Sequence, residues 1–481
     1  MKLRLCSFTL LCKVLLSMAA ISCSKEETYS IVVPSESILL TMPGQSGTTD
    51  FDASNISSID VTSTPKGWKV DNIDMYAGTI TVTAPSTFDN EEEVDGTVSL
   101  KCYTPIGTTM SISIYVAILQ NKDVDYTSAP ANCYIASKPE TRYKFNPYIG
   151  GSTTILDTHS VEVLWESELN LIKYLDLRDG VASFYLETVV DDDDKPLNKV
   201  TPGNAIIGAR NAAGEIIWSW HIWVTNSDPT AEVITLNDRT LLNLNLGADC
   251  NSEGDGDHDK IKGSYGLYYQ WGRKDPFIGP RYWNFDYNDN EHMYLPSEDS
   301  VVLKHVASSA ESGTTEWGIA NPVSIILGNP DNGYDWLYSH HDDTLWSSTH
   351  KTDQDPCPAG WRVPDSSIYA SLTITSVDDE MDWQAAQPMY GWHLEDTKSG
   401  NKFFFAAAGR RNYLDGRLDI VNDDPTRPIP WAGYYWTSST DGDNSVAMFF
   451  DLNSATRTWN GFDSSRSMKR ANAMPVRCVK E

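Results

Sequence analysis

The chain has 481 residues, of which 40% are hydrophobic and 21% charged, a composition typical of globular protein and not of long disordered segments. At roughly 150 residues per domain, this length predicts about three domains. The 66 acidic residues against 37 basic ones give a net charge of −29, which argues against nucleic acid as a partner. The 16 Trp and 23 Tyr residues favour a β-rich extracellular protein with aromatic surfaces.

The first 22 residues have the pattern of an export signal. Lys2 and Arg4 supply a basic start, and the apolar run that follows at 10–21 is too short to span a membrane as a stable helix. No later stretch approaches the ~18 apolar residues that a spanning helix needs, so we expect the rest of the chain to stay out of the bilayer.

The end of this signal, AISC at 20–23, resembles a bacterial lipobox, in which the sulfur of Cys23 is acylated. The following SKEE at 24–27 resembles the surface-export signal of Bacteroidetes lipoproteins. A cleaved signal with an incidental Cys and a plain acidic linker are the alternatives. The resemblance implies a lipoprotein exposed on the outer membrane, which contacts the membrane through its lipid anchor only.

After a linker at 23–29, apolar and polar residues alternate in short runs through residues 30–121. The clearest runs lie at 79–83, 96–100 and 111–118. Alternation with period two predicts half-buried strands, and about seven of them predict a β-sandwich with Trp68 in its core. The pattern resembles the immunoglobulin-like modules of Bacteroidetes surface proteins, including the BACON group.

A polar linker at 122–129 leads into a second β region, 130–227, which predicts a second sandwich module. Its strongest strand is 216–224, where large apolar side chains occupy both faces. A strand of this kind is usually central and packed on both sides. A platform that stacks sugars is the alternative interpretation.

From residue 228 to 481 the hydrophobic periods become irregular, loops lengthen, and Trp, Gly, Asn and Asp dominate. Helices are predicted at 364–372, after a capping residue, and at 378–387. The predicted fold class is therefore mainly β, with two N-terminal β-sandwich modules followed by an α+β domain at 228–481.

This last region carries a series of motifs. They read DPCPAGWRVP at 355–364, FFFAAAG at 403–409, GYYWTSST at 433–440 and PVRCVK at 475–480. In this order and spacing they resemble the major paralogous domain family first described in Fibrobacter succinogenes, which is grouped with C-type-lectin-like folds. Two upstream segments, WSWHIW at 218–223 and GLYYQWGRKDPF at 266–277, resemble fimbrillin-type and fimbrial tip lipoproteins of Bacteroidetes.

The resemblance implies a disulfide between Cys357 and Cys478, because C-type-lectin-like folds tie a helix to a terminal strand in this way. The bridge would close a loop of about 120 residues and contribute ~4–5 kcal/mol in the chain-entropy model. An exported protein can hold it. The sequence leaves open how Cys102, Cys133 and Cys250 pair.

Several groups of side chains could bind a metal. Acidic residues alternate at Asp255, Asp257 and Asp259, but an EF-hand would need Gly and Glu where Lys260 and Gly266 stand, so a solvated loop is the alternative. The tripeptide NPD at 329–331 resembles a lectin calcium motif, yet it precedes the predicted helix, and no Trp-Asn-Asp follows GYYWTSST. Another set lacks helical spacing: His340, His341, Asp342, Asp343 and His350. We expect no metal and no cofactor.

In lectin-like folds the long loops before the final strands form the recognition surface, so the resemblance places the ligand there. The candidate ligand-binding residues are Arg410, Arg411, Asn412, Tyr413, Asp415 and Trp431. Aromatic faces stack on sugars, while Arg, Asn and Asp bind hydroxyls. The alternative is that Tyr434 and Trp459 pack in the core and that Arg410 pairs with a neighbouring acid.

The sequence contains no GxSxG, HExxH or Walker motif, and we expect a binding protein that is not an enzyme. The predicted function is a surface-anchored adhesin or fimbrial tip subunit that displays its lectin-like domain to a glycan or to a host or bacterial surface protein. The alternatives are a structural pilus component that assembles with other pilus subunits, and a glycan-capture lipoprotein of a polysaccharide-uptake system. Pilus assembly predicts a detachable strand or an exposed sheet edge.

Overall fold

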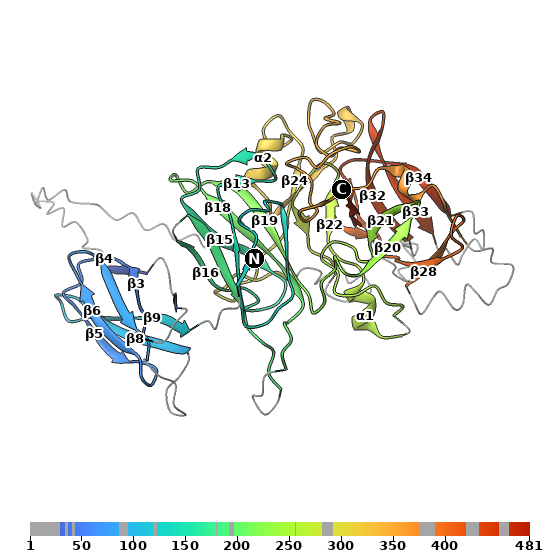
Figure 1. Ribbon diagram of the computed structural model, residues 1–481. Helices are drawn as coiled ribbons and strands as arrows, with labels where there is room; N and C mark the ends of the chain where they lie inside the picture. The colour runs from blue at the N-terminus through green and yellow to red at the C-terminus, as the bar shows by residue number, and fades with distance from the viewer. Residues whose placement is uncertain are drawn as a thin grey trace, which may run out of the picture.

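The computed structural model of this chain is mainly β, as predicted. The residues it describes are 29–33, 37–40, 44–85, 95–118, 123–178, 180–191, 197–254, 256–280, 292–374, 390–419, 432–451 and 461–481. Figure 1 shows a first sandwich in blue at one end, a second sandwich in the middle and a C-terminal region, yellow-green to red, at the other end.

The first sandwich has a core of its own. Its strands are β1 (Ser30–Val32), β2 (Ser37–Leu40), β3 (Ser46–Asp50), β4 (Asp52–Ser54), β5 (Ser58–Ser63), β6 (Lys69–Asp74), β7 (Thr79–Thr83), β8 (Asp95–Tyr103) and β9 (Thr109–Ile118). One sheet has the order β2-β9-β8-β5 and the other β3-β7-β6, with β1 paired to β4. Alternate residues such as Ile80, Val82 and Val116 are fully buried between the sheets, and Trp68 joins them, as predicted.

The second sandwich begins earlier than predicted. Its strands are β10 (Asp123–Asp125), β11 (Cys133–Ala136), β12 (Thr141–Phe145), β13 (Ile149–Gly150), β14 (Thr154–Ile155), β15 (Ser160–Glu166), β16 (Lys173–Arg178), β17 (Val181–Leu186), β18 (Gly203–Arg210) and β19 (Ile216–Val224). The sheets have the orders β11-β19-β18-β15 and β10-β12-β17-β16. Strand β10 lies within the predicted linker, and it forms because its backbone pairs in parallel with β12 although its side chains are polar.

Strand β19 is packed on both faces, as predicted. Trp218, Trp220 and Ile222 belong to the core of the second sandwich, whereas Trp223 belongs to a core shared with the C-terminal region. The three Trp side chains are at most 2% exposed, so the alternative of a sugar-stacking strand is wrong. The second sandwich and the C-terminal region each have a core of their own, and a third core crosses the predicted boundary at 228 and packs them together.

The C-terminal region consists of many short strands and, in its described part, two α-helices of six residues. They are β20 (Val233–Leu236), β21 (Arg239–Leu242), α1 (His258–Gly263), β22 (Tyr268–Gln270), β23 (Pro276–Phe277), β24 (Lys304–Ala307), α2 (Thr315–Ala320), β25 (Ser324–Leu327), η1 (Pro330–Asn332), β26 (Trp361–Arg362), η2 (Ser366–Tyr369), β27 (Leu372–Ile374), β28 (Gly391–Asp396), β29 (Lys402–Ala406), β30 (Arg410–Arg411), β31 (Leu418–Asp419), β32 (Ala432–Asp441), β33 (Asn444–Asp451), β34 (Phe462–Met468), β35 (Ala473–Met474) and β36 (Val479–Lys480). The start and the end of the region meet in one sheet, β20-β21-β36-β26.

The predicted disulfide is present beside this sheet, with an S–S distance of 2.04 Å and a Cα–Cα distance of 6.1 Å between Cys357 and Cys478. The predicted helix at 364–372 is reduced to the 3-10 turn η2, because Leu372–Ile374 pairs with β28 as a strand. The other predicted helix, 378–387, lies outside the described residues. The C-type-lectin-like assignment of the region stays a prediction.

Candidate functional site

The two segments that resemble fimbrial lipoproteins meet at the junction between the second sandwich and the C-terminal region. Lys274 Nζ lies 2.6 Å from Ser219 Oγ and 2.6 Å from Asp275 Oδ1, and 4.7 Å from the ring centroid of Trp218. The side chains of Lys274 and Asp275 are only 1% and 3% exposed. Buried charges persist where they are paired and hydrogen-bonded, so this pair holds the junction together and does not face a ligand.

Two further polar side chains are buried at the same junction. Arg273 Nη1 donates to Gln270 Oε1 at 2.9 Å and to the carbonyl of Ser324 at 2.8 Å, and burial lowers its pKa to about 10. His221 Nε2 lies 2.9 Å from Asn204 Oδ1, and its Nδ1 lies 3.2 Å from the hydroxyl of Tyr269. Burial lowers the pKa of His221 to about 3, so the ring is neutral at neutral pH and serves as a structural group.

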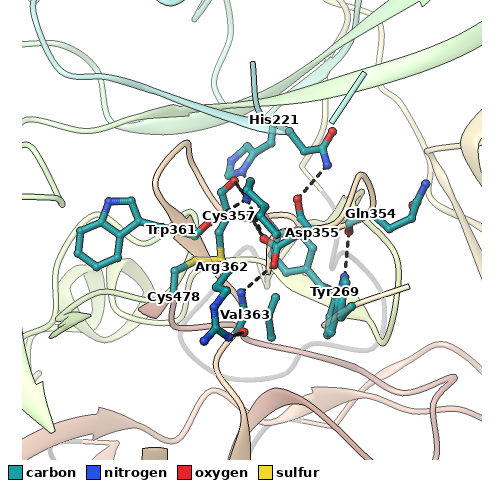
Figure 2. Close-up of a disulfide and its surroundings, with 12 residues drawn as sticks. His221, Tyr269, Gln354, Asp355, Cys357, Trp361, Arg362, Val363 and Cys478 are labelled. Carbon is teal, nitrogen blue, oxygen red and sulfur yellow. Dashed lines mark hydrogen bonds and ion pairs between the residues drawn. A yellow bond between two sulfur atoms is a disulfide. The ribbon is translucent and has the colours of Figure 1, made fainter. Parts of the chain in front are cut away.

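The segment around the disulfide is also structural. Figure 2 shows Asp355 beside the bridge, where its carboxylate accepts hydrogen bonds from the backbone N–H groups of Cys357 at 2.9 Å and Val363 at 2.8 Å. Lys351 Nζ completes the arrangement 2.9 Å from Asp355 Oδ1. Asp355 has no exposed surface in its side chain, so the motif DPCPAGWRVP fixes a loop next to the disulfide.

The two predicted arginines do not form an open binding surface. Arg411 is 1% exposed, and its guanidinium donates to the carbonyls of Ile278 at 2.7 Å and Gly416 at 3.1 Å. Its ligand-binding role is therefore wrong, because backbone acceptors inside the region already occupy its donors. Arg410 lies 3.6 Å from Asp419 and 5.2 Å from the ring centroid of Tyr434, which matches the alternative that it pairs with a neighbouring acid.

The other predicted ligand-binding residues build the turn between β30 and β31. Asn412 Nδ2 donates to Asp419 at 2.8 Å, and Asp415 accepts from the backbone of Arg417 at 3.1 Å. Tyr413 is half-buried and packs edge-on against Tyr334, with the ring centroids 5.0 Å apart. Trp431 lies outside the described residues, as does Trp459. The structure thus brings Asn412, Tyr413 and Asp415 together in one turn, where their described contacts are structural.

The acidic residues considered for calcium have a local role. Asp257 caps helix α1 by accepting from the backbone of Asp259 and Lys260, while Asp255 lies outside the described residues. Asn329 caps η1 in the same manner. Across the described part of the chain, no group of three or more His, Cys, Asp or Glu side chains is placed to hold a metal.

The histidine-rich segment gives one ion-pair cluster. His341 lies between two carboxylates, with Nδ1 2.8 Å from Asp335 and Nε2 3.2 Å from Asp443. Arg470, which is 1% exposed, pairs with Asp335 and with Asp343. The guanidinium of Arg470 would repel a metal cation at this place. The role of the cluster is instead to join the loops that carry these side chains. His340, Asp342 and His350 make only local contacts with Ser339, Thr344 and Ser347.

The remaining described cysteines are free thiols. Cys102 and Cys133 are buried, and Cys250 is half-buried. Burial raises the pKa of both Cys102 and Cys133, which lowers their reactivity as thiolates. Cys250 Sγ lies 3.4 Å from the hydroxyl oxygen of Ser264. The pairing of Cys102, Cys133 and Cys250, which the sequence left open, is thus answered by three separate thiols.

Several hollows in the described part of the chain are large enough for a small ligand, and two of them lie beside helix α1. The first, which we call the seam cleft, lies between the second sandwich and the C-terminal region and has a volume of about 390 Å³. Glu168, Asp249, Asp259 and Lys262 contribute its charged groups. Pro280 and His292 border it, and the residues between them lie outside the described part of the chain.

The second hollow, which we call the hairpin groove, lies over the hairpin of β28 and β29 and has a volume of about 610 Å³. One wall comes from the hairpin residues His393, Lys402 and Phe404, and the other from the 251–253 loop and Lys260 of α1. Ligand sites typically measure ~300–1,000 Å³ and combine apolar surface with a few polar groups. The groove meets both conditions, and it is the candidate site that we pursue.

Comparison with known proteins leaves the family open. No protein-family model matches the chain, and no curated protein matches it. Solved structures with some likeness include the D00-D0 domain of intimin, at 11% identity and a TM-score of 0.17 over 40% of this chain and 96% of that chain. The tandem Ig repeats of Dlar are similar at 11% identity and a TM-score of 0.15, over 41% of this chain and 97% of that chain. SGBP-B of the Bacteroides ovatus mixed-linkage glucan utilization locus is similar at 10% identity and a TM-score of 0.12, over 40% of this chain and 43% of that chain. Scores this low assign no ligand to this chain.

The described helices are all short. None of them is long and apolar enough to cross a membrane.

Proposed function

We propose that this chain is a lipid-anchored surface adhesin, or a fimbrial tip subunit, that presents its C-terminal region as a glycan-binding head. The observation that best supports the proposal is the serial order of the parts, with the first sandwich at one end and the C-terminal region at the other (Figure 1). A lipid on Cys23 would attach the membrane next to the first sandwich, which begins at Ser30. The C-terminal region would then project away from the cell.

The C-terminal region, which is the proposed head, is packed firmly onto the second sandwich. The second sandwich and the C-terminal region share a core that includes Trp165, Trp223 and Trp271. The carboxylate of Asp353, in the C-terminal region, accepts hydrogen bonds from the backbone N–H groups of Ser152 at 2.7 Å and Thr153 at 2.9 Å in the β13–β14 hairpin. A surface that is already ordered loses less conformational entropy on binding, which favours recognition.

The joint with the first sandwich rests on stacked rings. Tyr115 of β9 and Tyr174 of β16 lie with their centroids 3.8 Å apart and their planes within 4° of each other. Tyr174 has a φ of 50°, a left-handed backbone that an aromatic residue adopts only when its surroundings impose it. The stack and this backbone conformation support a defined orientation of the first sandwich relative to the second.

Strand β11 argues against the donor-strand form of the structural-pilus alternative, whereas β5 is an exposed edge strand of the first sandwich. In each sandwich an early strand pairs in parallel with the last one, β2 with β9 and β11 with β19. Strand β11 is buried at all four residues, and the backbone of its Cys133 also forms an isolated parallel β-bridge with Pro358 of the C-terminal region. A strand held on both sides does not fit the detachable strand that donor-strand exchange requires.

The test is a glycan array probed with residues 24–481, which lack the lipidated Cys23. We expect binding to at least one class of oligosaccharide. Residues 24–121, which include the separate core of the first sandwich, are the matched control and should bind nothing. A folded 24–481 chain that binds no glycan, or binding that the 24–121 fragment reproduces, would contradict the proposal.

A further inference from the structure

We infer that the hairpin groove binds a sugar that carries a carboxylate, such as a uronic or sialic acid unit of a longer glycan. This inference rests on the proposed glycan-binding function and specifies the ligand class and its site. It depends on three features of the groove, which are an apolar surface, a fixed polar wall and a local excess of positive charge.

The apolar surface comes from the hairpin. Strand pairing sets His393 opposite Phe404, and their ring centroids lie 5.5 Å apart. Phe403 is half-buried, while Phe404 and Ile234 are 7% and 9% exposed at the base of the groove. Aromatic rings that remain partly accessible offer the C–H face of a sugar ring a surface on which to pack.

The polar wall is held in place from behind. Asn251 Nδ2 donates to the carbonyl of Phe404 at 3.1 Å and to Asn243 Oδ1 at 3.0 Å. The buried Arg477 donates to the same Phe404 carbonyl at 3.3 Å and to Asn251 Oδ1 at 3.4 Å. Arg477 is thus a positioning residue, because it joins the loop that carries Asn251 to the strand that carries Phe404. A wall fixed in this way needs little reordering when a ligand arrives.

The charge of the groove differs in sign from that of the chain. Two lysines, Lys260 and Lys402, line it on opposite walls, and the carboxylate of Glu253 is the acid among the lining residues. Glu253 is hydrogen-bonded to Nε2 of His393, so its carboxylate already has a partner within the groove. The chain as a whole has a net charge of −29, which makes a site lined by two lysines and one paired acid a local exception.

Two further acids lie next to the groove but are not among its lining residues. Asp257 lies 3.8 Å from Lys260, but both side chains are about half exposed, and such surface pairs are weak. Glu395 lies opposite Lys402 in the β28–β29 register and is not one of the groove's lining residues. Lys402 on the hairpin and Lys260 on α1 are therefore the cationic lysines that line the groove and can meet a ligand carboxylate.

The experiment uses residues 24–481 and matched pairs of immobilised oligosaccharides that differ only in the oxidation of a neutral sugar to its uronic acid, together with sialylated glycans and their desialylated counterparts. We expect the wild-type chain to prefer the acidic member, with a dissociation constant that rises between low and high salt because screening weakens charge pairs. The variant Lys260→Gln/Lys402→Gln should lose about tenfold or more of this affinity, as expected for removal of charge-assisted hydrogen bonds.

The matched control is Lys398→Gln. Lys398 lies in the turn of the same hairpin and pairs with Asp238 at 3.0 Å, outside the groove, so its loss should leave the affinity unchanged. Glycan binding that prefers neutral sugars, or that survives unchanged in Lys260→Gln/Lys402→Gln, would overturn the assignment of the groove and leave the proposed adhesin intact. A wild-type chain that binds neither member of any pair would instead overturn the proposed function.

Discussion

The buried pair Lys274 and Asp275 gives the sharpest test of how the second sandwich is joined to the C-terminal region. The two side chains are almost fully buried, 2.6 Å apart, and Lys274 also contacts Ser219 and the ring of Trp218 on β19. We consider Lys274→Met, Asp275→Asn and the double variant. Each single change leaves one member of the pair buried without its counter-charge.

Removing one member of a buried ion pair typically lowers the free energy of unfolding by ~3–5 kcal/mol, whereas replacing both members costs much less. Each single variant should therefore lose about 3 kcal/mol, and the double variant should lose less than either single variant, which corresponds to a coupling energy of more than ~3 kcal/mol. Burial lowers the pKa of Lys274, and the charge of Asp275 partly restores it.

Asp275→Asn removes that restoring charge, so the unfolded chain binds more protons than the folded chain between the lowered pKa of Lys274 and the ordinary value of ~10.4. The stability of Asp275→Asn should accordingly rise with pH in this window. In the wild type the charge of Asp275 keeps the pKa of Lys274 closer to its ordinary value, so the free energy of unfolding should rise less with pH.

Denaturant titration followed by Trp fluorescence is the appropriate assay. Residues 30–121 contain Trp68 as their single Trp, so the signal reports mainly on the body formed by the second sandwich and the C-terminal region. The control Lys398→Met alters an exposed lysine and should change stability by less than ~0.5 kcal/mol. Single variants that cost under ~1 kcal/mol, or strict additivity in the double variant, would refute the view that this pair holds the junction.

Three further predictions concern other parts of the chain. Cys23→Ala should release the protein from membranes, which fractionation would detect; unchanged membrane association would rule out the lipid anchor. Cys357→Ser/Cys478→Ser should lose about 5 kcal/mol, because the bridge spans a sequence separation of 121 residues; an unchanged denaturation midpoint would contradict this. Burial raises the pKa of Asp353, but hydrogen bonds from Ser152, Thr153 and Thr154 outweigh it and hold the pKa below its usual value. Its stabilisation is therefore present above ~pH 3.9 and lost as pH falls through the lower folded value, so the stability gap between wild type and Asp353→Asn should close in acid.

The parts of the fold that sequence predicts well are those in which neighbouring residues carry the signal. Alternation in 79–83 and 111–118 gives β7 and β9, and the two apolar faces of 216–224 give a central strand covered on both sides. The Cys357–Cys478 bridge followed from a family resemblance and not from spacing, and it is present.

The candidate site was harder to predict, because its contacts are long-range. The lectin-like resemblance predicts that Arg411 lies in a recognition loop, yet its donors are filled by the carbonyl of Ile278, more than a hundred residues earlier. The hairpin groove joins Lys260 to Lys402 across a similar separation. The run at 403–405 shows that a strand is apolar, but alternation alone does not reveal which of its rings borders an open groove.

The shared core leads to a last prediction, about where the chain can be cut. Residues of the second sandwich, among them Leu164, Trp165, Ile206 and Trp223, belong to the same core as the C-terminal region. Burying a large apolar side chain contributes ~1.5–3 kcal/mol, so removing these four takes away on the order of 10 kcal/mol, which is comparable to the whole stability of a typical domain. The fragment 228–481 should therefore aggregate or bind a hydrophobic dye, whereas a fragment that starts at Asp123, the first residue of β10, should remain monomeric. Size-exclusion chromatography and thermal unfolding of the two fragments compare them directly. A monomeric 228–481 fragment that unfolds cooperatively within a few degrees of the longer one would show that the shared core is dispensable.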